Sequence, residues 1–550
     1  MKIIVISLAL DESGPGGGAK CETAAPILTT PRPGITLEIW KKGHRMKSRI
    51  LVSTMTLSFA AIASAADISV PQDAATIQAA IDLAQDGDRV LVSPGTYTEQ
   101  INFAGKNIIL ESTDGVETTT IDGGGNLGFV ITMNSGEEDV LLRGFTVTGG
   151  FGEAGSIGAG AGGGLLVEGA SITIENAVFT GNFGVLGGGV SIIEGDAVVR
   201  ESRFEDNQAL HGGGLYIEQG TLLIEESEFE NNAATNNGGA VAIFWLTDAA
   251  ITDTDFTNND ANSFGGAVYT NHAEIDFNRL SFTDNGKAEE GEHNAWTIST
   301  FGGGAIYTTD TNGRINASRF VRNVAFAGGG LYVASTGTVE VVNSLFTEHG
   351  TTCGNCGYAP IYVNSSSPTI INCTIADNST PSGIFTTFNG FPTIFNTIIS
   401  GPDNATSGNG LTALESSLVV GTVFAATINQ GSSVVEDALL DSQNDSAPLA
   451  GSPSINAGDN SAVPADITTD LLGNPRIVNG TVDIGAIEFG AAPPQESIAG
   501  DMNGDGSVGA MDLLMLLDAW GDCHGHCPAD LNADGRVDGT DLLMLLNNWG

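Results

Sequence analysis

A short glycine motif recurs along the middle of the chain and constrains the fold more than any other feature. It reads Gly-Gly-Gly/Ala followed by an aliphatic residue, and successive copies lie 25, 25, 26, 27, 38 and 25 residues apart. The third small residue of each copy is Gly164, Gly189, Gly214, Ala240, Ala267, Ala305 or Gly330. A repeat of this period indicates a stack of equivalent units rather than one globular core.

A second motif, Phe-x-x-Asn, keeps step with the glycine motif. Both series lengthen at the same place, so a single insertion around 287–300 explains both. The copies are Phe179/Asn182, Phe204/Asn207, Phe229/Asn232, Phe256/Asn259, Phe282/Asn285 and Phe320/Asn323. We expect the phenylalanines to stack inside and the asparagines to form a structural ladder at an interior corner, where Asn tolerates left-handed backbone angles.

Apolar residues alternate within each repeat, which is typical of β-strands. Strands and turns fill the 25 residues and leave no room for a crossover helix. The sequence therefore predicts an all-β solenoid, a right-handed parallel β-helix with coils of about 25 residues. The aliphatic residue after each glycine motif should point inward.

The two phased motifs resemble the repeats of polymorphic outer-membrane proteins within the pectin-lyase-like β-helix superfamily. The resemblance covers residues 67–489 and implies architecture rather than one activity, since that superfamily holds lyases, hydrolases, esterases and adhesins. A short amphipathic helix beginning at Asp73 is expected to cap the front. The stretches SPSINAGD at 452–459, GNPR at 473–476 and DIGAIEF at 483–489 resemble the closing segment of bacterial β-helices.

A different repeat follows a linker predicted at 490–498. DMNGDGSVGAMD starts at Asp501 and DLNADGRVDGTD starts at Asp530, and this spacing of oxygen ligands is typical of EF-hand calcium loops. The expected ligands of two calcium ions are Asp501, Asn503, Asp505, the Ser507 carbonyl and Asp512, then Asp530, Asn532, Asp534, the Arg536 carbonyl and Asp541.

Each loop runs into nearly the same apolar helix, DLLMLLDAWG or DLLMLLNNWG. Residues 499–550 thereby resemble a type I dockerin, which implies calcium binding and a cohesin-like or surface-anchoring partner. The pairs Ala510-Met511 and Gly539-Thr540 stand where that family usually carries hydroxyl residues, so cohesin binding carries over less well than calcium binding.

The N-terminal part contains a secretory signal. From Met46, a basic start is followed by an apolar run and the small residues Ala63-Ser64-Ala65, so we expect 46–66 to be a signal peptide. Residues 1–45 are interpreted as a misassigned upstream start. No other stretch is long and apolar enough for a transmembrane helix, and the mature protein is expected to be secreted or attached to the cell surface.

The chain has six cysteines. In an exported protein, the pairs Cys353/Cys356 and Cys523/Cys527 are expected to form local disulfides, with zinc binding at Cys523-His524-Gly525-His526-Cys527 as the alternative. Cys373 would then be free and buried, and Cys21 precedes the expected start.

The charge is strongly acidic, with 65 Asp+Glu against 20 Lys+Arg and a net −45. Such a surface excludes nucleic acid as the main partner and disfavours anionic membranes and anionic polysaccharides. Three of the few basic residues, Arg314, Arg319 and Arg322, lie close together in sequence, and they are the candidates for lyase chemistry if the β-helix is catalytic.

One column of the predicted coils is aromatic. Two residues after the glycine motifs come Tyr216, Tyr269, Tyr307, Tyr332 and, in the next coil, Tyr362. On the outer face they would form either a self-packing ladder or a platform for sugar rings. We therefore expect a secreted, non-catalytic protein that binds carbohydrate or another surface ligand and is tethered through its calcium module. The alternative is an extracellular polysaccharide lyase or glycoside hydrolase of the same superfamily.

Overall fold

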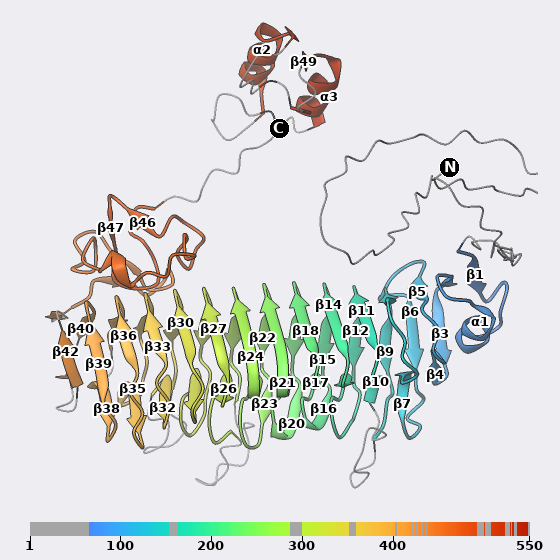
Figure 1. Cartoon of the computed structure of the whole chain (residues 1–550), viewed down its shortest axis with the longest axis horizontal. Coiled ribbons are helices and arrows are strands. Elements are labelled where there is room, and N and C mark those ends of the chain that lie inside the picture. Colours follow the sequence, from blue (N-terminus) through green and yellow to red (C-terminus); the bar gives the residue numbers. More distant parts are fainter. Residues whose placement is uncertain are drawn as a thin grey trace, which may run out of the picture. The chain divides into compact units, whose positions relative to one another are not determined.

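The computed structural model describes residues 65–152, 163–286, 300–350, 359–401, 404–420, 422–423, 427–430, 433–435, 437–491, 500, 508–522, 529, 531–532 and 536–547. Most of them form the predicted solenoid, in which each strand pairs in parallel with the equivalent strand of the next coil (Figure 1). The predicted all-β solenoid is confirmed.

Each regular coil contributes two strands to one large sheet and one strand to a second sheet. The 26 strands of the large sheet are β1 (Asp67–Val70), β2 (Arg89–Val92), β4 (Ile101–Asn102), β5 (Ile109–Ser112), β7 (Phe129–Met133), β8 (Val140–Arg143), β10 (Gly163–Glu168), β11 (Ser171–Glu175), β13 (Val190–Ile193), β14 (Asp196–Arg200), β17 (Leu215–Glu218), β18 (Thr221–Glu225), β21 (Val241–Thr252), β24 (Val268–Asn278), β26 (Ile306–Thr309), β27 (Asn312–Asn316), β29 (Leu331–Ala334), β30 (Val339–Val342), β32 (Ile361–Asn364), β33 (Thr369–Ile371), β35 (Ser382–Thr387), β36 (Thr393–Phe395), β38 (Asn404–Gly408), β39 (Thr412–Glu415), β41 (Thr422–Val423) and β42 (Thr427–Gln430).

The second sheet runs the length of the solenoid with one strand per coil. Its 14 strands are β3 (Gly95–Thr98), β6 (Thr119–Asp122), β9 (Thr146–Thr148), β12 (Val178–Thr180), β15 (Arg203–Glu205), β19 (Glu228–Glu230), β22 (Asp255–Thr257), β25 (Ser281–Thr283), β28 (Arg319–Val321), β31 (Leu345–Thr347), β34 (Thr374–Ala376), β37 (Ile398–Ile399), β40 (Leu418–Val420) and β43 (Ser433–Val435). A short third sheet closes the central coils with β16 (Gln208–His211), β20 (Ala233–Asn237) and β23 (Asp260–Ala261).

The elements outside the coils are few and short. They are helix α1 (Ile77–Leu83), the 3-10 turn η1 (Asn460–Ala462), helices α2 (Ala510–Asp518) and α3 (Gly539–Asn547), and three antiparallel hairpins formed by β44 (Leu440–Asp441) with β45 (Ala447–Pro448), β46 (Ile477–Val478) with β47 (Thr481–Val482), and β48 (Gly521–Asp522) with β49 (Arg536–Val537).

The interior is built from the residue columns that the repeat predicts. The aliphatic residues that follow the glycine motifs are fully buried, and so are the phenylalanines of the second motif. From Phe179 to Phe346 these rings stack face to face, with centroids 4.3 to 5.2 Å apart. The buried side chains of successive coils therefore form one continuous core.

The asparagine ladder is buried and structural, as expected. Each Nδ2 group from Asn182 to Asn285 donates to the Oδ1 atom of the next asparagine at 2.9 to 3.1 Å. The expected backbone reason is wrong, because the left-handed residue is the one before each ladder position, for example Asp206 and Asn231 with φ of 56°. The ladder asparagines are instead required for their amide hydrogen bonds.

Helix α1 closes the front of the core. It begins at Ile77 rather than at Asp73, because Thr76 caps it by accepting a hydrogen bond from the Ala79 N–H group. Asp73 lies in the preceding turn, where its carboxylate accepts a hydrogen bond from the Ser69 N–H group. Ile77, Ala80 and Ile81 face the core as the sequence predicts.

Residues 437–489, here called the flank segment, fold back along the side of the coils. Asn343, Thr374 and Asn396, which come from three successive coils, each form hydrogen bonds with this segment (Figure 1). Its central side chain is Arg476, which is 1% exposed and lies 3.2 Å from Glu488. The sequence predicts that residues 452–489 close the end of the solenoid; the structure shows the flank segment along the side of several coils.

Candidate functional site

The aromatic column of the large sheet is continuous. Ring centroids are 5.5 Å apart between Tyr269 and Tyr307, 4.8 Å between Tyr307 and Tyr332, and 4.7 Å between Tyr332 and Tyr362. Two further rings, Phe244 and Phe385, belong to the column although the tyrosine pattern does not include them. The ring of Phe244 bridges Tyr216 and Tyr269 at the coil that carries Ala242, and Phe385 stacks on Tyr362.

The exposure of these tyrosines varies along the column. Tyr216 and Tyr269 are buried, at 5% and 6% exposure, whereas Tyr307, Tyr332 and Tyr362 are half-buried. The small residue Ala242 leaves space for Phe244, which packs against both buried tyrosines. Only the half of the column from Tyr307 onward is therefore open to a ligand.

The ring planes limit how a ligand can meet the column. From Tyr269 to Tyr362 neighbouring rings are inclined by only 9 to 27°, so their faces cover one another. The Tyr332 hydroxyl accepts a hydrogen bond from Asn364 Nδ2 at 2.9 Å, and burial raises the pKa of Tyr307 and Tyr332. The column thus offers ring edges and neutral hydroxyl groups rather than open aromatic faces.

The basic side chains of the described β-helix and flank segment are all engaged. The single lysine, Lys106, donates to the carbonyl groups of Ile81 and Asp82 at the end of α1. Every arginine forms an ion pair, and these are Arg89, Arg143, Arg200, Arg203, Arg279, Arg314, Arg319, Arg322 and Arg476. No cation of the described coils is left unpaired to receive an acidic sugar.

The three candidate lyase arginines do not form one cluster. Arg314 pairs with Glu340 and with Asp466 of the flank segment. Arg319 pairs with Asp445, and Arg322 lies between Asp284 and Glu348. Each guanidinium is tied to its own carboxylates, and this arrangement counts against a shared catalytic role.

The C-terminal module is a duplicated helix pair with its own small core. Val508 and Val537 occupy equivalent positions 29 residues apart, as do Leu516 and Leu545, and all four are buried. Of the expected calcium ligands, Asp512, Asn532, Arg536 and Asp541 are described, whereas Asp501, Asn503, Asp505, Ser507, Asp530 and Asp534 lie outside the described residues.

The twelfth loop positions fit a bound cation. The Asp512 and Asp541 side chains are 1% and 0% exposed, although each carries a carboxylate. Asp541 accepts hydrogen bonds from the N–H groups of Leu531 and Asp538, which draws both ends of the second loop toward its carboxylate. A buried carboxylate at the end of an oxygen-rich loop is the usual anchor for calcium.

The outer faces of the two module helices are apolar and match each other. Leu514 and Leu517 of α2 are 59% and 47% exposed, and the equivalent Leu543 and Leu546 of α3 are 62% and 46% exposed. Exposed apolar patches of this kind typically mark protein docking surfaces.

The cysteine predictions are tested in part. Cys373 is fully buried and forms no disulfide, as expected. Burial raises the pKa of its thiol to about 12, so the group is unreactive. Cys21, Cys353, Cys356, Cys523 and Cys527 lie outside the described residues. Among the helices of the described residues, none has the length and apolar character of a membrane span.

Two family models match the chain. Residues 161–355 match the right handed beta helix region, and residues 499–549 match the dockerin type I domain. The protein is therefore a right-handed parallel β-helix followed by a region that matches the dockerin type I domain.

Comparison with solved structures finds several matches at low identity. The surface adhesin PfbA of Streptococcus pneumoniae is 14% identical over 67% of this chain and 90% of its own, with a TM-score of 0.38. The pectate lyase Pel9A is 14% identical over 78% and 97%, with a TM-score of 0.35. The pectin methylesterase PemA from Erwinia chrysanthemi is 12% identical over 46% and 79%, with a TM-score of 0.27. No curated protein sequence matches the chain significantly.

Proposed function

We propose that this is an exported, non-catalytic protein that binds carbohydrate along its β-helix and docks through its dockerin domain on a cohesin-type partner. The observation that carries the proposal is the matched pair of exposed leucine patches on α2 and α3 of the dockerin domain. Apolar patches that are exposed in an isolated module are typically covered by a partner in the complex.

Docking is tested with the full chain and a panel of immobilised type I cohesin domains. Wild-type protein should be retained in calcium and released by a chelator. Replacing Leu514, Leu517, Leu543 and Leu546 together by Asp should abolish retention, because charged groups would enter the interface core. The control is Leu83→Asp, an exposed leucine of α1. Retention of the quadruple variant at wild-type strength would contradict the proposed docking surface.

Carbohydrate binding is proposed for the open half of the aromatic column, at Tyr307, Tyr332 and Tyr362. Tyr216 and Tyr269 are buried and pack against Phe244, so they would not touch a ligand. Tyrosine edges and hydroxyl groups suit a neutral polyhydroxylated ligand, and the paired arginines suit an acidic one poorly.

A glycan panel scored for both retention and product release separates binding from catalysis. Tyr307→Ala and Tyr332→Ala should each weaken retention without any change in glycan length, while Tyr97→Ala, outside the column, should not. Unsaturated or reducing-end products from wild-type protein would instead establish the lyase or hydrolase alternative.

A further inference from the structure

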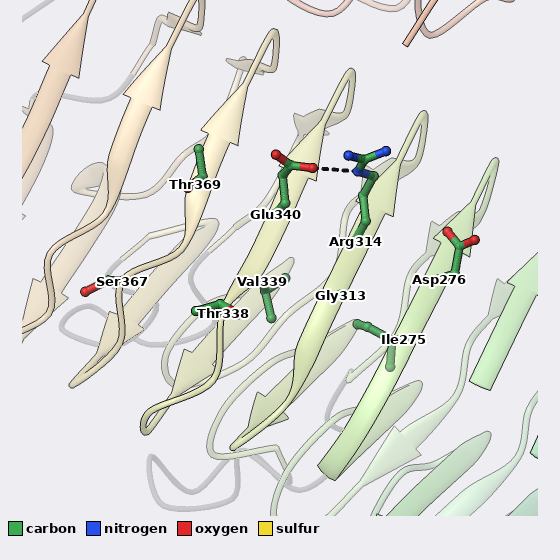
Figure 2. Close-up of a pocket in the computed structure, with 9 residues that line it drawn as sticks. All are labelled: Ile275, Asp276, Gly313, Arg314, Thr338, Val339, Glu340, Ser367 and Thr369. Atoms are coloured by element: carbon green, nitrogen blue, oxygen red, sulfur yellow. Dashed lines mark hydrogen bonds and ion pairs between the residues drawn. The ribbon is translucent and has the colours of Figure 1, made fainter. Parts of the chain in front are cut away.

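A polar groove crosses the outer face of the large sheet at strands β24, β27, β30 and β33 (Figure 2). Its volume is about 560 Å³, and it extends over four successive coils from β24 to β33. The aligned outward residues of these coils are Asp276, Arg314, Glu340 and Thr369. None of the proposed carbohydrate contacts at the tyrosines lies in it.

The floor of the groove is formed by backbone at Gly313. This residue stands in register with Ile275 and Val339, yet its φ is +122°. A Cβ atom added there would lie 1.9 Å from the Ile275 carbonyl oxygen. Only glycine fits at this position, because any larger residue would collide with the backbone of the neighbouring strand β24.

Ion pairs hold the middle of the groove. Arg314 donates through Nε to Glu340 at 2.5 Å (Figure 2), and it donates through Nη1 to Asp466 of the flank segment. Two residues earlier in each of these two coils, the Thr338 hydroxyl donates to Asn312 Oδ1 at 3.0 Å. These contacts fix the groove in one shape before any ligand arrives.

The two ends of the groove, at β24 and at β33, carry polar groups that have no protein partner among the described residues. Asp276 is exposed and forms no hydrogen bond or ion pair with its side chain anywhere in the described part of the chain (Figure 2). The hydroxyl groups of Ser367 and Thr369 are equally unengaged there. One free carboxylate at β24 and two free hydroxyl groups at β33 thus lie at the two ends of the groove, with the ion pair of Arg314 and Glu340 between them.

The charge balance around the groove is negative. Asp276, Glu340 and Asp466 contribute three carboxylates against the single guanidinium of Arg314, which gives −3 + 1 = −2. The whole chain carries −45. An anionic ligand is therefore repelled at both scales, and a cationic ligand is attracted.

We propose that this groove binds a chain of amino sugars laid across the coils, with one protonated amine at Asp276 and hydroxyl groups of the following sugars at Glu340, Ser367 and Thr369. An ammonium group supplies the donors that the free carboxylate lacks, and the hydroxyl groups at the β33 end suit the hydroxyls of the sugars further along the chain. The inference rests on the carbohydrate-binding function proposed above and names a class of sugar for it.

The test is isothermal titration calorimetry of the full chain in calcium with three probes: a glucosamine hexamer, its fully N-acetylated counterpart and hexalysine. The glucosamine hexamer should bind most tightly, and its affinity should fall several-fold when salt is raised from low to physiological strength. Asp276→Asn should weaken binding roughly five- to tenfold, because it removes the charge and keeps the size.

The matched control is Asp248→Asn, an exposed carboxylate of the same sheet outside the groove. Equal losses in both variants would mean that only the net charge matters and would overturn the inference. Equal binding of the N-acetylated hexamer, or of hexalysine, would overturn it as well. Neutral glycans retained through Tyr307 and Tyr332, with no response to Asp276→Asn, would overturn the groove assignment alone. A chain that binds no glycan at all would remove the proposed function too.

Discussion

His349 is the one ladder position occupied by a residue other than asparagine between Asn182 and Asn378. Its ring Nδ1 atom accepts a hydrogen bond from the backbone N–H group of Asn323 at 3.1 Å. The backbone N–H group of His349 donates to Asn378 Oδ1 at 2.9 Å. The Nε2 atom is buried and has no hydrogen-bond partner in the described structure. Burial lowers the pKa of His349 to about 3, so the folded protein holds the ring neutral.

This histidine should make the β-helix less stable in acid. The unfolded chain takes up a proton below about pH 6.5, whereas the folded chain does so only near pH 3. The contribution of His349 to the free energy of unfolding is therefore fully present above about pH 6.5. It is lost as pH falls toward about 3, by at most about 1.4 kcal/mol per pH unit.

The substitution His349→Asn should restore the ladder and flatten that dependence. Urea unfolding at pH 7 and pH 4.5 is the measurement, with the exposed His272→Asn as control. The midpoint of His349→Asn should exceed that of wild type at pH 4.5 by more than it does at pH 7. An equal difference at both pH values would show that protonation of His349 has no influence.

At the scale of elements, the flank segment depends on the buried pair of Arg476 and Glu488. Arg476 also donates to the Ala486 carbonyl at 3.1 Å and to Asn343 Oδ1 of the coils at 3.3 Å. Burial raises the pKa of Glu488 to about 7, and the positive charge of Arg476 opposes that rise. The Arg476 guanidinium therefore connects different parts of the flank segment with one another and binds the segment to the coils.

Arg476→Met should release the flank segment, because it leaves Glu488 buried without its cation. The expected cost is on the order of 3–5 kcal/mol. Limited proteolysis followed by mass spectrometry should find new cuts within 437–489 while the coils stay intact. Glu488→Gln, which keeps the size of the side chain, should have a smaller effect. Proteolysis of the coils at the same rate would contradict a locally held segment.

The dockerin domain should depend on calcium independently of the β-helix. Metal neutralises loop carboxylates that otherwise repel one another, so a chelator should expose 499–550 to protease and leave 67–489 protected. Asp541→Ala should reproduce the chelator effect in calcium, because it removes the buried anchor of the second loop. Protection of the domain in the presence of the chelator would argue against calcium-coupled folding.

For the whole molecule, export predicts a shortened chain. Cleavage after the small residues that follow Met46 should leave Ala66 or Asp67 at the N-terminus. Mass spectrometry of the secreted protein is the measurement, and any peptide from residues 1–45 would contradict the interpretation of Met46 as the start.

The periodic part of the molecule could be predicted from sequence because each coil repeats the same local chemistry. Phe204 and Asn207 have the same roles as Phe229 and Asn232, so one coil explains the next. The position of the flank segment could not be predicted in this way. Arg476 forms a hydrogen bond with Asn343, which lies 133 residues earlier, and no sequence repeat indicates this contact. The burial of Tyr216 and Tyr269 could not be predicted either, because it depends on Phe244, which is not part of the repeated tyrosine pattern.

Those tyrosines and the backbone of the groove each involve a small residue. Tyr216 and Tyr269 are buried because Ala242 makes room for Phe244, and Gly313 is the only residue that fits beside the Ile275 backbone. The sequence shows both small residues, but a pattern of apolar and polar positions does not show which neighbour fills the space they leave.

The position of the flank segment determines how the solenoid would bear mechanical load. The linker to the dockerin domain leaves just after Phe489, whose N–H group is bound by Asp483, and Glu488 is paired with Arg476. A pull on the docked domain therefore reaches the coils through the contacts at Asn343, Thr374 and Asn396 before it reaches β43. Parallel coils peel apart most easily from an exposed end, and this attachment directs tension away from that end.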